Sequence, residues 1–417
     1  MRILKLTPQI ERQLLRSRQE RDVEADQIAA QIIADVRKRG DAALFAWARK
    51  LDGVKLRRQS LWISPRSMRA AHSEVAPEFI RALRHAAQNV RRVAAKQLPK
   101  PWSLQVEPGV RISQLVRPIA TIGCYIPGGR FALVSTLLMT VIPAQVAGVR
   151  RIVVICPRPN KELLAAADFL GINEFAHVGG AHGIAALAYG TRSIPRVDKI
   201  FGPGNRYVTA AKQRVSHDCA IDLPAGPTEA IVLATQGNPR WIAADLLAQA
   251  EHAPDAGSFL VTTSESLAKQ VQTEIAAQLK KLPADNPAHF SIRKTGAILA
   301  TNSFQSACTF VNQFAGEHLS IPDNADLLLK NITAAGTIFV GPWAAQPFGD
   351  YATGSNHVLP TGGWARARGG LSAADFTKCI SVQTITKTGF SALANDVQIL
   401  ARAEGLLAHA NAIEVRR

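Results

Sequence analysis

The chain has 417 residues, enough for about two or three domains with sizeable hydrophobic cores. Hydrophobic residues make up 47% of it and the mean hydropathy is +0.03, values typical of an ordinary globular protein. No apolar run reaches bilayer-spanning length, and the first residues lack the apolar core of a signal peptide. Five cysteines without CxxC spacing suit small core residues in a reducing compartment, so a cytoplasmic location is expected.

The net charge of +17 is unusual, and most of the excess lies before residue 120. There, 24 Lys and Arg residues stand against 11 Asp and Glu residues, an imbalance that suits nucleic acid or another polyanion. However, the basic residues alternate with alanines and acids at helical spacing, as in "NVRRVAAK", and few aromatic residues accompany them. We therefore favour solvated helix faces over a nucleic-acid-binding surface, which remains the alternative.

The predicted elements begin with helices and continue as an alternation of strands and helices. Residues 22–98 carry apolar residues at steps of three and four, as in "DQIAAQIIADVRKRG", which predicts amphipathic helices. From Val116, helical stretches separate the predicted strands "PIATIGCYIP", "RRIVVICP", "EFAHVGG" and "VDKIFGPGN". A second series follows "IDLPAGP", with the strands "EAIVLAT", "SFLVTT", "GAILAT" and "GTIFVG". This alternation predicts βαβ units on parallel sheets.

The expected fold class is therefore α/β, with two doubly wound, incomplete Rossmann-like lobes, an N-terminal helical segment and a C-terminal helical tail. The predicted domains are a helical arm (1–21), a discontinuous first lobe (22–121 with 230–370), a second lobe (122–229) and a tail (371–417). The tail ends in "ALANDVQILARAEGLLAHANAIEVRR", predicted as one amphipathic helix. In such sheets, ligands collect at the carboxyl ends of the strands and in crevices between lobes.

Three glycine-rich turns follow predicted strands: "YIPGG" (125–129), "VGGAHG" (178–183) and "GPGNRY" (202–207). Backbone N–H groups at the helix start that follows such a turn suit a phosphate. One GxG by itself is equally well a tight strand-to-helix turn. Three of these turns at one edge of a sheet favour an anionic or nucleotide ligand.

Two segments carry candidate metal ligands. Gln249 and His252, in "LLAQAEHAPD", are three residues apart and would share one helix face, although a helix-capping histidine is the alternative. Asp350 and His357 lie in the Gly-, Ser- and Asn-rich segment "FGDYATGSNHVLP", where a turn-forming aspartate is the alternative.

The tail and one further segment complete the candidates. Glu404 and His409 are five residues apart in the tail helix, and by themselves they suit a solvated surface. Taken together, the three segments nevertheless offer neutral nitrogen and oxygen donors and one carboxylate, a set that suits Zn²⁺ or Mn²⁺: Gln249, His252, Asp350 and His409. In "FAGEHLSI", Glu317 and His318 place an acid next to a base immediately before a predicted strand, as acid–base machinery beside such a centre would require.

From about residue 22 to its end, the sequence resembles the histidinol dehydrogenase family. The resemblance is carried by "IDLPAGPTE" followed by "LLAQAEH", and by "VDKIFGPGN", "GEHL", "GDYATGSNHVLP" and "AHANAI". It implies histidine biosynthesis: a zinc-dependent, NAD-linked four-electron oxidation of L-histidinol to L-histidine through the aldehyde. It also implies one Zn²⁺ per subunit and a homodimer in which the C-terminal helix reaches the partner's site.

The resemblance also implies roles for individual residues. The implied metal ligands are Gln249, His252, Asp350 and His409. The implied catalytic pair is Glu317 and His318. The implied substrate contacts are Thr228, Gln249, His252, His318, Asp350, Glu404 and His409. The implied NAD contacts are Tyr125, His182 and Asn205. The first lobe would thus hold the metal and catalytic residues, and the second lobe would lie on the NAD side.

The sequence departs from the family pattern at two of these positions. His182 stands where Gln is usual, and Thr228 stands where Ser is commoner. Two other functions stay open: a zinc and NAD dehydrogenase on the same scaffold that oxidises another polar alcohol, and a non-catalytic nucleic-acid-binding protein. The presence of Glu404 and His409 favours an amino-imidazole substrate over another alcohol.

Overall fold

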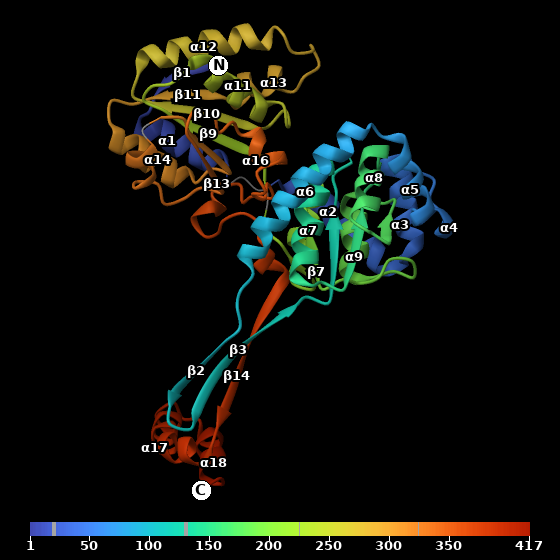
Figure 1. Cartoon of the computed structure of the whole chain (residues 1–417), viewed down its shortest axis with the longest axis vertical. Coiled ribbons are helices and arrows are strands. Elements are labelled where there is room, and N and C mark those ends of the chain that lie inside the picture. Colours follow the sequence, from blue (N-terminus) through green and yellow to red (C-terminus); the bar gives the residue numbers. More distant parts are fainter. Residues whose placement is uncertain (19–21, 129–131, 225, 324) are drawn as a thin grey trace.

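The computed structural model describes residues 1–18, 22–128, 132–224, 226–323 and 325–417. Two lobes lie next to each other, and a narrow stalk extends away from them to a pair of helices (Figure 1). The described strands form three sheets, in the orders β1-β11-β10-β9-β12-β13, β6-β5-β4-β7-β8 and β14-β3-β2. The predicted α/β fold with two lobes of parallel sheet is confirmed.

The six-stranded lobe is built on parallel strand pairs. Its strands are β1 (Arg2–Lys5), β9 (Glu229–Leu233), β10 (Gly257–Thr262), β11 (Ala297–Ala300), β12 (His318–Ile321) and β13 (Thr337–Val340). Its helices are α1 (Pro8–Ser17), α11 (Pro239–Ala250), α12 (Glu265–Leu279), α13 (Ala288–Lys294), α14 (Phe304–Phe314), α15 (Ala325–Leu329) and α16 (Pro347–Tyr351). Apolar side chains of α11, α12 and α13 cover one face of the sheet, and those of α1 and α14 cover the other. Central strands are therefore buried on both faces, as in β9.

The five-stranded lobe has the same layered construction. Its strands are β4 (Thr121–Tyr125), β5 (Arg151–Ile155), β6 (Glu174–Ala176), β7 (Lys199–Phe201) and β8 (Ala220–Ile221). Its helices are α2 (Val23–Arg39), α3 (Asp41–Trp47), α4 (Arg58–Leu61), α5 (Pro65–Glu74), α6 (Pro77–Gln97), α7 (Val134–Ala147), α8 (Lys161–Phe169), α9 (Gly180–Tyr189) and α10 (Arg206–Val215). Helices α2, α9 and α10 share one core cluster, whereas α6, α7 and α8 share the other.

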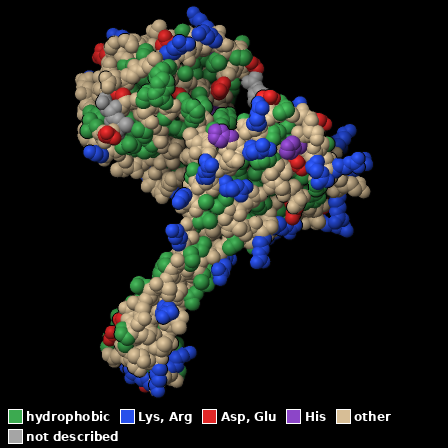
Figure 2. Space-filling view, viewed as in Figure 1, with side chains coloured by type: hydrophobic (Ala, Val, Ile, Leu, Met, Phe, Trp, Pro, Cys, Tyr) green, Lys and Arg blue, Asp and Glu red, His purple; other side chains and the backbone are tan. Residues whose placement is uncertain are grey.

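The stalk is an antiparallel three-stranded ribbon that carries two helices. Its elements are β2 (Trp102–Glu107), β3 (Val110–Pro118), β14 (Thr377–Ile385), α17 (Lys387–Ala403) and α18 (Leu407–Glu414). Hydrophobic side chains lie open along it (Figure 2), among them Trp102, Leu104, Val106, Ile380, Val382, Ile385, Leu400 and Leu407. None of the helices in the described part of the chain combines the length and apolar character needed to cross a membrane.

The placement of residues 22–121 differs from the predicted domains. The predicted domains placed this segment with residues 230–370, but α2 to α6 pack on the five-stranded lobe. Their apolar side chains share core clusters with those of α7 to α10. Periodicity shows which face of a helix is apolar but not which sheet that face covers, so the partner lobe could not be chosen from spacing.

Both ends of the chain also differ from the prediction. The predicted helical arm begins with a strand, since β1 pairs in parallel with β11 at the edge of the six-stranded sheet, and only then does α1 pack against α14. The predicted helical tail contains β14, and its single helix is divided into α17 and α18. The break follows from Gly405, whose φ of +75° lies in the left-handed region that ends helices.

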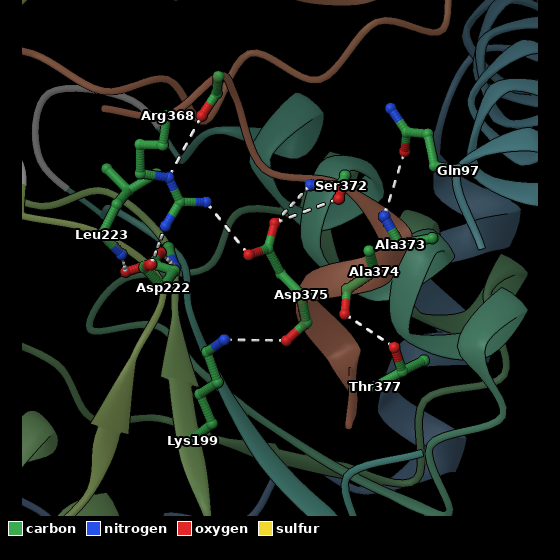
Figure 3. A network of polar contacts seen from close by, with 12 residues as sticks. Gln97, Lys199, Asp222, Leu223, Arg368, Ser372, Ala373, Ala374, Asp375 and Thr377 are labelled. Carbon is green, nitrogen blue, oxygen red and sulfur yellow. Dashed lines mark hydrogen bonds and ion pairs between the residues drawn. The ribbon is translucent and has the colours of Figure 1, made fainter. Parts of the chain in front are cut away.

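A polar network fastens the segment after the six-stranded lobe to the five-stranded lobe (Figure 3). The Arg368 guanidinium donates to the backbone carbonyl of Asp222 and, at 3.2 Å, to Oδ1 of Asp375. Lys199 Nζ donates to the Asp375 carbonyl at 2.9 Å, and Oδ2 of Asp375 accepts from the Ser372 N–H at 2.9 Å. The network thus ties the chain before β14 to strands β7 and β8.

Lys212 and Asp222 form a buried ion pair at the carboxyl end of β7. The Nζ to Oδ1 distance is 2.5 Å, and the two residues are 3% and 4% exposed. Lys212 Nζ also donates to the Gly202 carbonyl at 2.7 Å, and the Gly202 N–H donates to Asp222 Oδ2 at 2.7 Å. The pair therefore holds the first glycine of "GPGNRY" in place.

We expect Lys212→Met to lower the free energy of unfolding by about 3 kcal/mol, because it leaves the Asp222 carboxylate buried without its cation. Urea denaturation followed by circular dichroism measures the change. The control is Arg151→Met, which breaks the more exposed Arg151–Glu174 pair and should cost less than about 1 kcal/mol. Equal losses of unfolding free energy in the two variants would contradict the prediction that a buried ion pair costs more to break than an exposed one.

Candidate active site

Glu317 and His318 lie where α14 turns into β12, and both are buried, at 7% and 3% exposure. The turn passes through Ala315, whose φ of +48° is left-handed, an uncommon conformation for alanine. Because β12 lies between β9 and β13, the pair enters the sheet next to the first residues of β9. The site therefore lies at the amino ends of these strands, whereas the general rule for α/β sheets predicts their carboxyl ends.

The Glu317 carboxylate is held by the start of β9. Its Oε2 accepts a hydrogen bond from the Glu229 N–H at 3.0 Å and another from the Thr228 hydroxyl. The Thr228 hydroxyl oxygen accepts in turn from Gln249 Nε2 at 2.7 Å. Burial raises the pKa of Glu317 above its usual value, although His318 and these hydrogen bonds oppose the rise. One polar chain thus joins Gln249, Thr228 and Glu317.

The His318 imidazole lies between two carboxylates. Its Nδ1 is 3.8 Å from Glu317 Oε2, and its Nε2 is 3.7 Å from Asp350 Oδ1. Within the described residues neither nitrogen has a hydrogen-bond partner, although both are buried. Burial lowers the pKa of His318, but the two carboxylates outweigh burial and raise it above its usual value. A buried imidazole without a partner is suited to bind a ligand group.

Asp350 lies on the short helix α16 and faces several histidines. Burial raises its pKa, but His318, His357 and His252 outweigh burial and lower it. His252 lies beyond the end of α11, so it does not share a helix face with Gln249 as the spacing predicted, and its N–H bonds to the Gln249 carbonyl at 3.3 Å. Burial lowers the pKa of His252 despite the attraction of Asp350. Gln249, His252 and Asp350 therefore surround the Glu317–His318 pair.

Glu404 and His409 lie elsewhere in the chain. Glu404 caps the end of α17 and His409 belongs to α18, and both side chains are exposed. These helices lie at the far end of the stalk from both lobes (Figure 1). A single chain therefore does not bring His409 to the other three predicted metal ligands.

Three of the four predicted metal ligands lie near the pair, and the Gln249 amide oxygen among them accepts a hydrogen bond from Gln346. An imidazole nitrogen and a carboxylate oxygen are common donors to zinc-like ions, whereas an amide oxygen is an uncommon one. The described residues contain no group of three or more His, Cys, Asp and Glu side chains able to hold a metal. Of the four predicted donors, Gln249, His252 and Asp350 belong to this lobe, so a metal bound by all four would need His409 from outside it.

The predicted NAD residues lie on the five-stranded lobe, at the carboxyl ends of its strands. Tyr125 ends β4, His182 lies in the first turn of α9 after β6, and Asn205 caps α10 after β7. The strand order reverses at β4, and the crevice at such a switch point is where dinucleotides bind in doubly wound sheets. Residue 129 of the "YIPGG" turn lies outside the described residues.

Tyr125, His182 and Asn205 differ in burial and in the hydrogen bonds that they already make. The Tyr125 ring is buried, which raises the pKa of its hydroxyl. His182 is fully buried with Nε2 3.1 Å from Asp52 Oδ2, while its Nδ1 has no hydrogen-bond partner in the described residues. Asn205 Oδ1 accepts from the N–H groups of Tyr207 and Val208, both at 3.1 Å, but its residue is exposed.

His357 connects the six-stranded lobe to the five-stranded lobe. His357 Nδ1 lies 2.9 Å from the Asp350 carbonyl, and its Nε2 lies 3.2 Å from the hydroxyl of Thr136. Thr136 belongs to α7, the helix that follows β4 and its Tyr125. The amino edge of the six-stranded sheet is thereby joined to the carboxyl edge of the five-stranded sheet.

Sequence analysis missed several residues around the pair. Gln346 donates to Gln249 Oε1, and Asp245, whose burial raises its pKa to about 6, accepts from the Gln346 backbone N–H. Neither residue belongs to a recognisable pattern. Glu229 was also missed, although an acid within the apolar strand "EAIVL" is a signal, since carboxylates are almost never buried without a partner.

Comparisons with known proteins agree with this architecture. The sequence model of the histidinol dehydrogenase family matches residues 15–417. The chain is 46% identical over 393 residues to a histidinol dehydrogenase of Geobacillus kaustophilus (strain HTA426), covering 92% of each chain. It is 43% identical over 394 residues to one of Methanosarcina mazei, covering 92% of this chain and 90% of that one. The crystal structure of histidinol dehydrogenase from Elizabethkingia anophelis superposes with a TM-score of 0.92 at 36% identity, covering 100% of this chain and 98% of that chain.

Proposed function

The chain belongs to the histidinol dehydrogenase family, and from that premise we propose that it oxidises L-histidinol to L-histidine through L-histidinal, with two NAD molecules accepting one hydride each. The observation that carries the proposal is the His318 imidazole, buried without a hydrogen-bond partner in the described residues and adjacent to the Glu317 carboxylate. An acid and a base side by side suit two successive oxidations at one carbon.

In the first oxidation, His318 takes the hydroxyl proton of histidinol while the carbon loses a hydride to NAD. An imidazole is suited to this task because it exchanges protons near neutral pH. The carboxylates of Glu317 and Asp350 stabilise the imidazolium that results, since they lie 3.8 Å and 3.7 Å from its nitrogens. The product is histidinal.

In the second oxidation, Glu317 takes a proton from a water molecule as the water oxygen bonds to the aldehyde carbon. The His318 imidazolium returns its proton to the aldehyde oxygen in the same step, which completes the hydrated aldehyde and leaves the imidazole neutral again. The hydrated aldehyde then loses its second hydride to another NAD, and its hydroxyl proton passes to the neutral His318 imidazole. The hydrogen bonds from Thr228 and the Glu229 N–H orient the Glu317 carboxylate toward this water. The products are histidine, two NADH molecules and the released protons.

Zinc, when bound, would hold the imidazole and amine of histidinol and so orient the alcohol carbon. Gln249, His252 and Asp350 would hold it together with the partner subunit's His409, and Thr228 and the partner subunit's Glu404 would contact the substrate. NAD would bind beside Tyr125, His182 and Asn205. The switch point of the five-stranded sheet and the start of α10 support this placement.

A homodimer with exchanged tails would complete the site. The proposal is supported by the stalk, whose apolar side chains lie open in a single chain, including Leu400 at 64% and Leu407 at 70% exposure. Exposed apolar surface on this scale marks protein interaction sites. An interface there would cover the stalk and bring α18 to a second subunit.

Mixing the protein with histidinol and NAD should produce two NADH molecules for each histidinol consumed. Absorbance measures the NADH, and chromatography measures the histidine. A chelator should remove most of this activity, and added Zn²⁺ should restore it. A panel of other polar alcohols serves as the control for substrate identity. Full activity after exhaustive chelation would refute the metal requirement, and faster oxidation of another alcohol would refute the substrate.

A further inference from the structure

Arg18 ends the N-terminal segment of the six-stranded lobe with its side chain buried inside it. It caps the C-terminus of α1, which packs against α14, and its side chain is 10% exposed. Its guanidinium makes three polar contacts there, so Arg18 is a buried, paired charge of this lobe and not a solvated surface charge.

The first partner of Arg18 is the Glu229 carboxylate. Arg18 Nε donates to Glu229 Oε1 at 2.5 Å, and a second guanidinium nitrogen donates to Glu229 Oε2. This paired arrangement fixes the direction of the carboxylate as well as neutralising it. Glu229 begins β9, and its backbone N–H donates to Glu317 Oε2 at 3.0 Å. Fixing Glu229 therefore fixes a donor to the Glu317 carboxylate.

The second partner of Arg18 is Phe314, the last residue of α14. The third guanidinium nitrogen donates to the Phe314 carbonyl, and the guanidinium carbon lies 3.6 Å from the centroid of the Phe314 ring. Phe314 immediately precedes Ala315, whose left-handed φ of +48° turns the chain toward Glu317. Alanine keeps that conformation only where its surroundings hold it. Arg18 thus anchors the backbone from which Glu317 projects.

We propose that Arg18 is a positioning residue for Glu317, holding the turn that carries it through Phe314 and the amide that orients it through Glu229. The inference rests on the role proposed above for Glu317 in the aldehyde step. It gives the N-terminal segment an indirect part in the second oxidation, because Arg18 contacts Glu229 and Phe314 and not the Glu317 carboxylate itself.

The charges around Glu317 give Arg18 a second effect. His318 faces Glu317 from β12 and Glu229 faces it from β9, while Thr228 contributes a neutral hydroxyl. Of these groups, the Glu229 carboxylate opposes ionisation of Glu317. Because Arg18 neutralises Glu229, both carboxylates can be accommodated in one buried region.

The test separates the two hydride transfers by single-turnover stopped-flow with histidinol. Arg18→Met should slow the second NADH phase by about 10- to 100-fold, the scale of a catalytic group displaced by about 1 Å, while the first phase changes less than about twofold. In a Glu317→Gln background, Arg18→Met should cause no further loss in the second phase, because it acts through the group already removed.

Hydrogen–deuterium exchange supplies a readout independent of activity. Arg18→Met should raise deuterium uptake in peptides that cover residues 312–319 and 228–230. The control is Arg214→Met, which removes an exposed pair with Asp26 on the other lobe and should change neither uptake there nor the NADH phases. If Arg18→Met does not fold, Arg18→Lys should show smaller changes in the same direction, because one charge is kept without the paired contacts.

Each outcome decides the inference. Equal slowing of both phases, additive losses with Glu317→Gln, or unchanged uptake in the two peptides would overturn it. If the wild-type protein does not oxidise histidinol, the proposed function fails instead, and the deuterium uptake alone then decides whether Arg18 holds the turn.

Discussion

Replacing His318 by Asn should lower the rates of both oxidation steps by at least about 100-fold, the usual contribution of a general acid–base group. Glu317→Gln should slow mainly the aldehyde step. The difference follows from geometry. The imidazole lies between two carboxylates, and neither of its nitrogens has a hydrogen-bond partner in the part of the chain that the structure describes. The Glu317 carboxylate, in contrast, is oriented by a hydroxyl and a backbone amide. NADH formation from histidinol and, separately, from histidinal measures the two steps.

A matched control is available for the histidine substitution. His72 also lies beside a carboxylate, with Nδ1 2.9 Å from Asp168 Oδ2, but it belongs to α5 on the five-stranded lobe. His72→Asn should leave both rates unchanged. If Glu317→Gln reduced both steps equally, the separate assignment of water activation to Glu317 would be wrong.

Coexpression of two inactive variants should restore about one quarter of the wild-type activity if each site takes its fourth ligand from the partner of a two-fold dimer. One variant is His318→Asn with an intact tail, and the other is His409→Asn with an intact lobe. About half of the dimers would then be mixed. In each mixed dimer, one site combines the intact His318 of one subunit with the intact His409 of the other.

The purified variants should each be inactive when expressed separately, and a mixture of two His318→Asn preparations with different affinity tags controls for the coexpression itself. Tandem purification on both tags isolates the mixed dimers, in which activity per dimer should approach half that of the wild type. Mixed dimers without activity would show that the tail serves the site of its own chain. Full activity of the separately expressed His409→Asn variant would show that His409 has no role.

Much of the candidate site was visible in the sequence because its residues are grouped in short strings. Glu317 and His318 were predicted as an acid–base pair ahead of a strand, and β12 begins at His318. The pairing of Gln249 with His252 was also noticed, but for the wrong reason. The helix ends at Ala250, so the two residues approach the site through a turn and not along one helix face.

Other features depend on contacts that no local pattern records. Arg18 and Glu229 are 211 positions apart, and their meeting depends on α1 docking against α14. The edge of the sheet was also predicted wrongly, since Glu317 and His318 lie at the amino ends of β9 and β12 and not at their carboxyl ends. The link between the lobes through His357 and Thr136 likewise joins residues 221 positions apart.

Alternation of apolar runs and the special residues at turns determined, without any coordinates, that this chain forms parallel sheets covered by helices, and its motif strings determined its family. Those properties are local, because they depend on period and on backbone conformation over a few residues. Only the tertiary structure decided which lobe takes helices α2 to α6, which strand ends meet, and that Glu404 and His409 stand apart on a stalk. Such outcomes depend on how distant apolar and charged surfaces fit together, and the order of residues along a chain does not measure that fit.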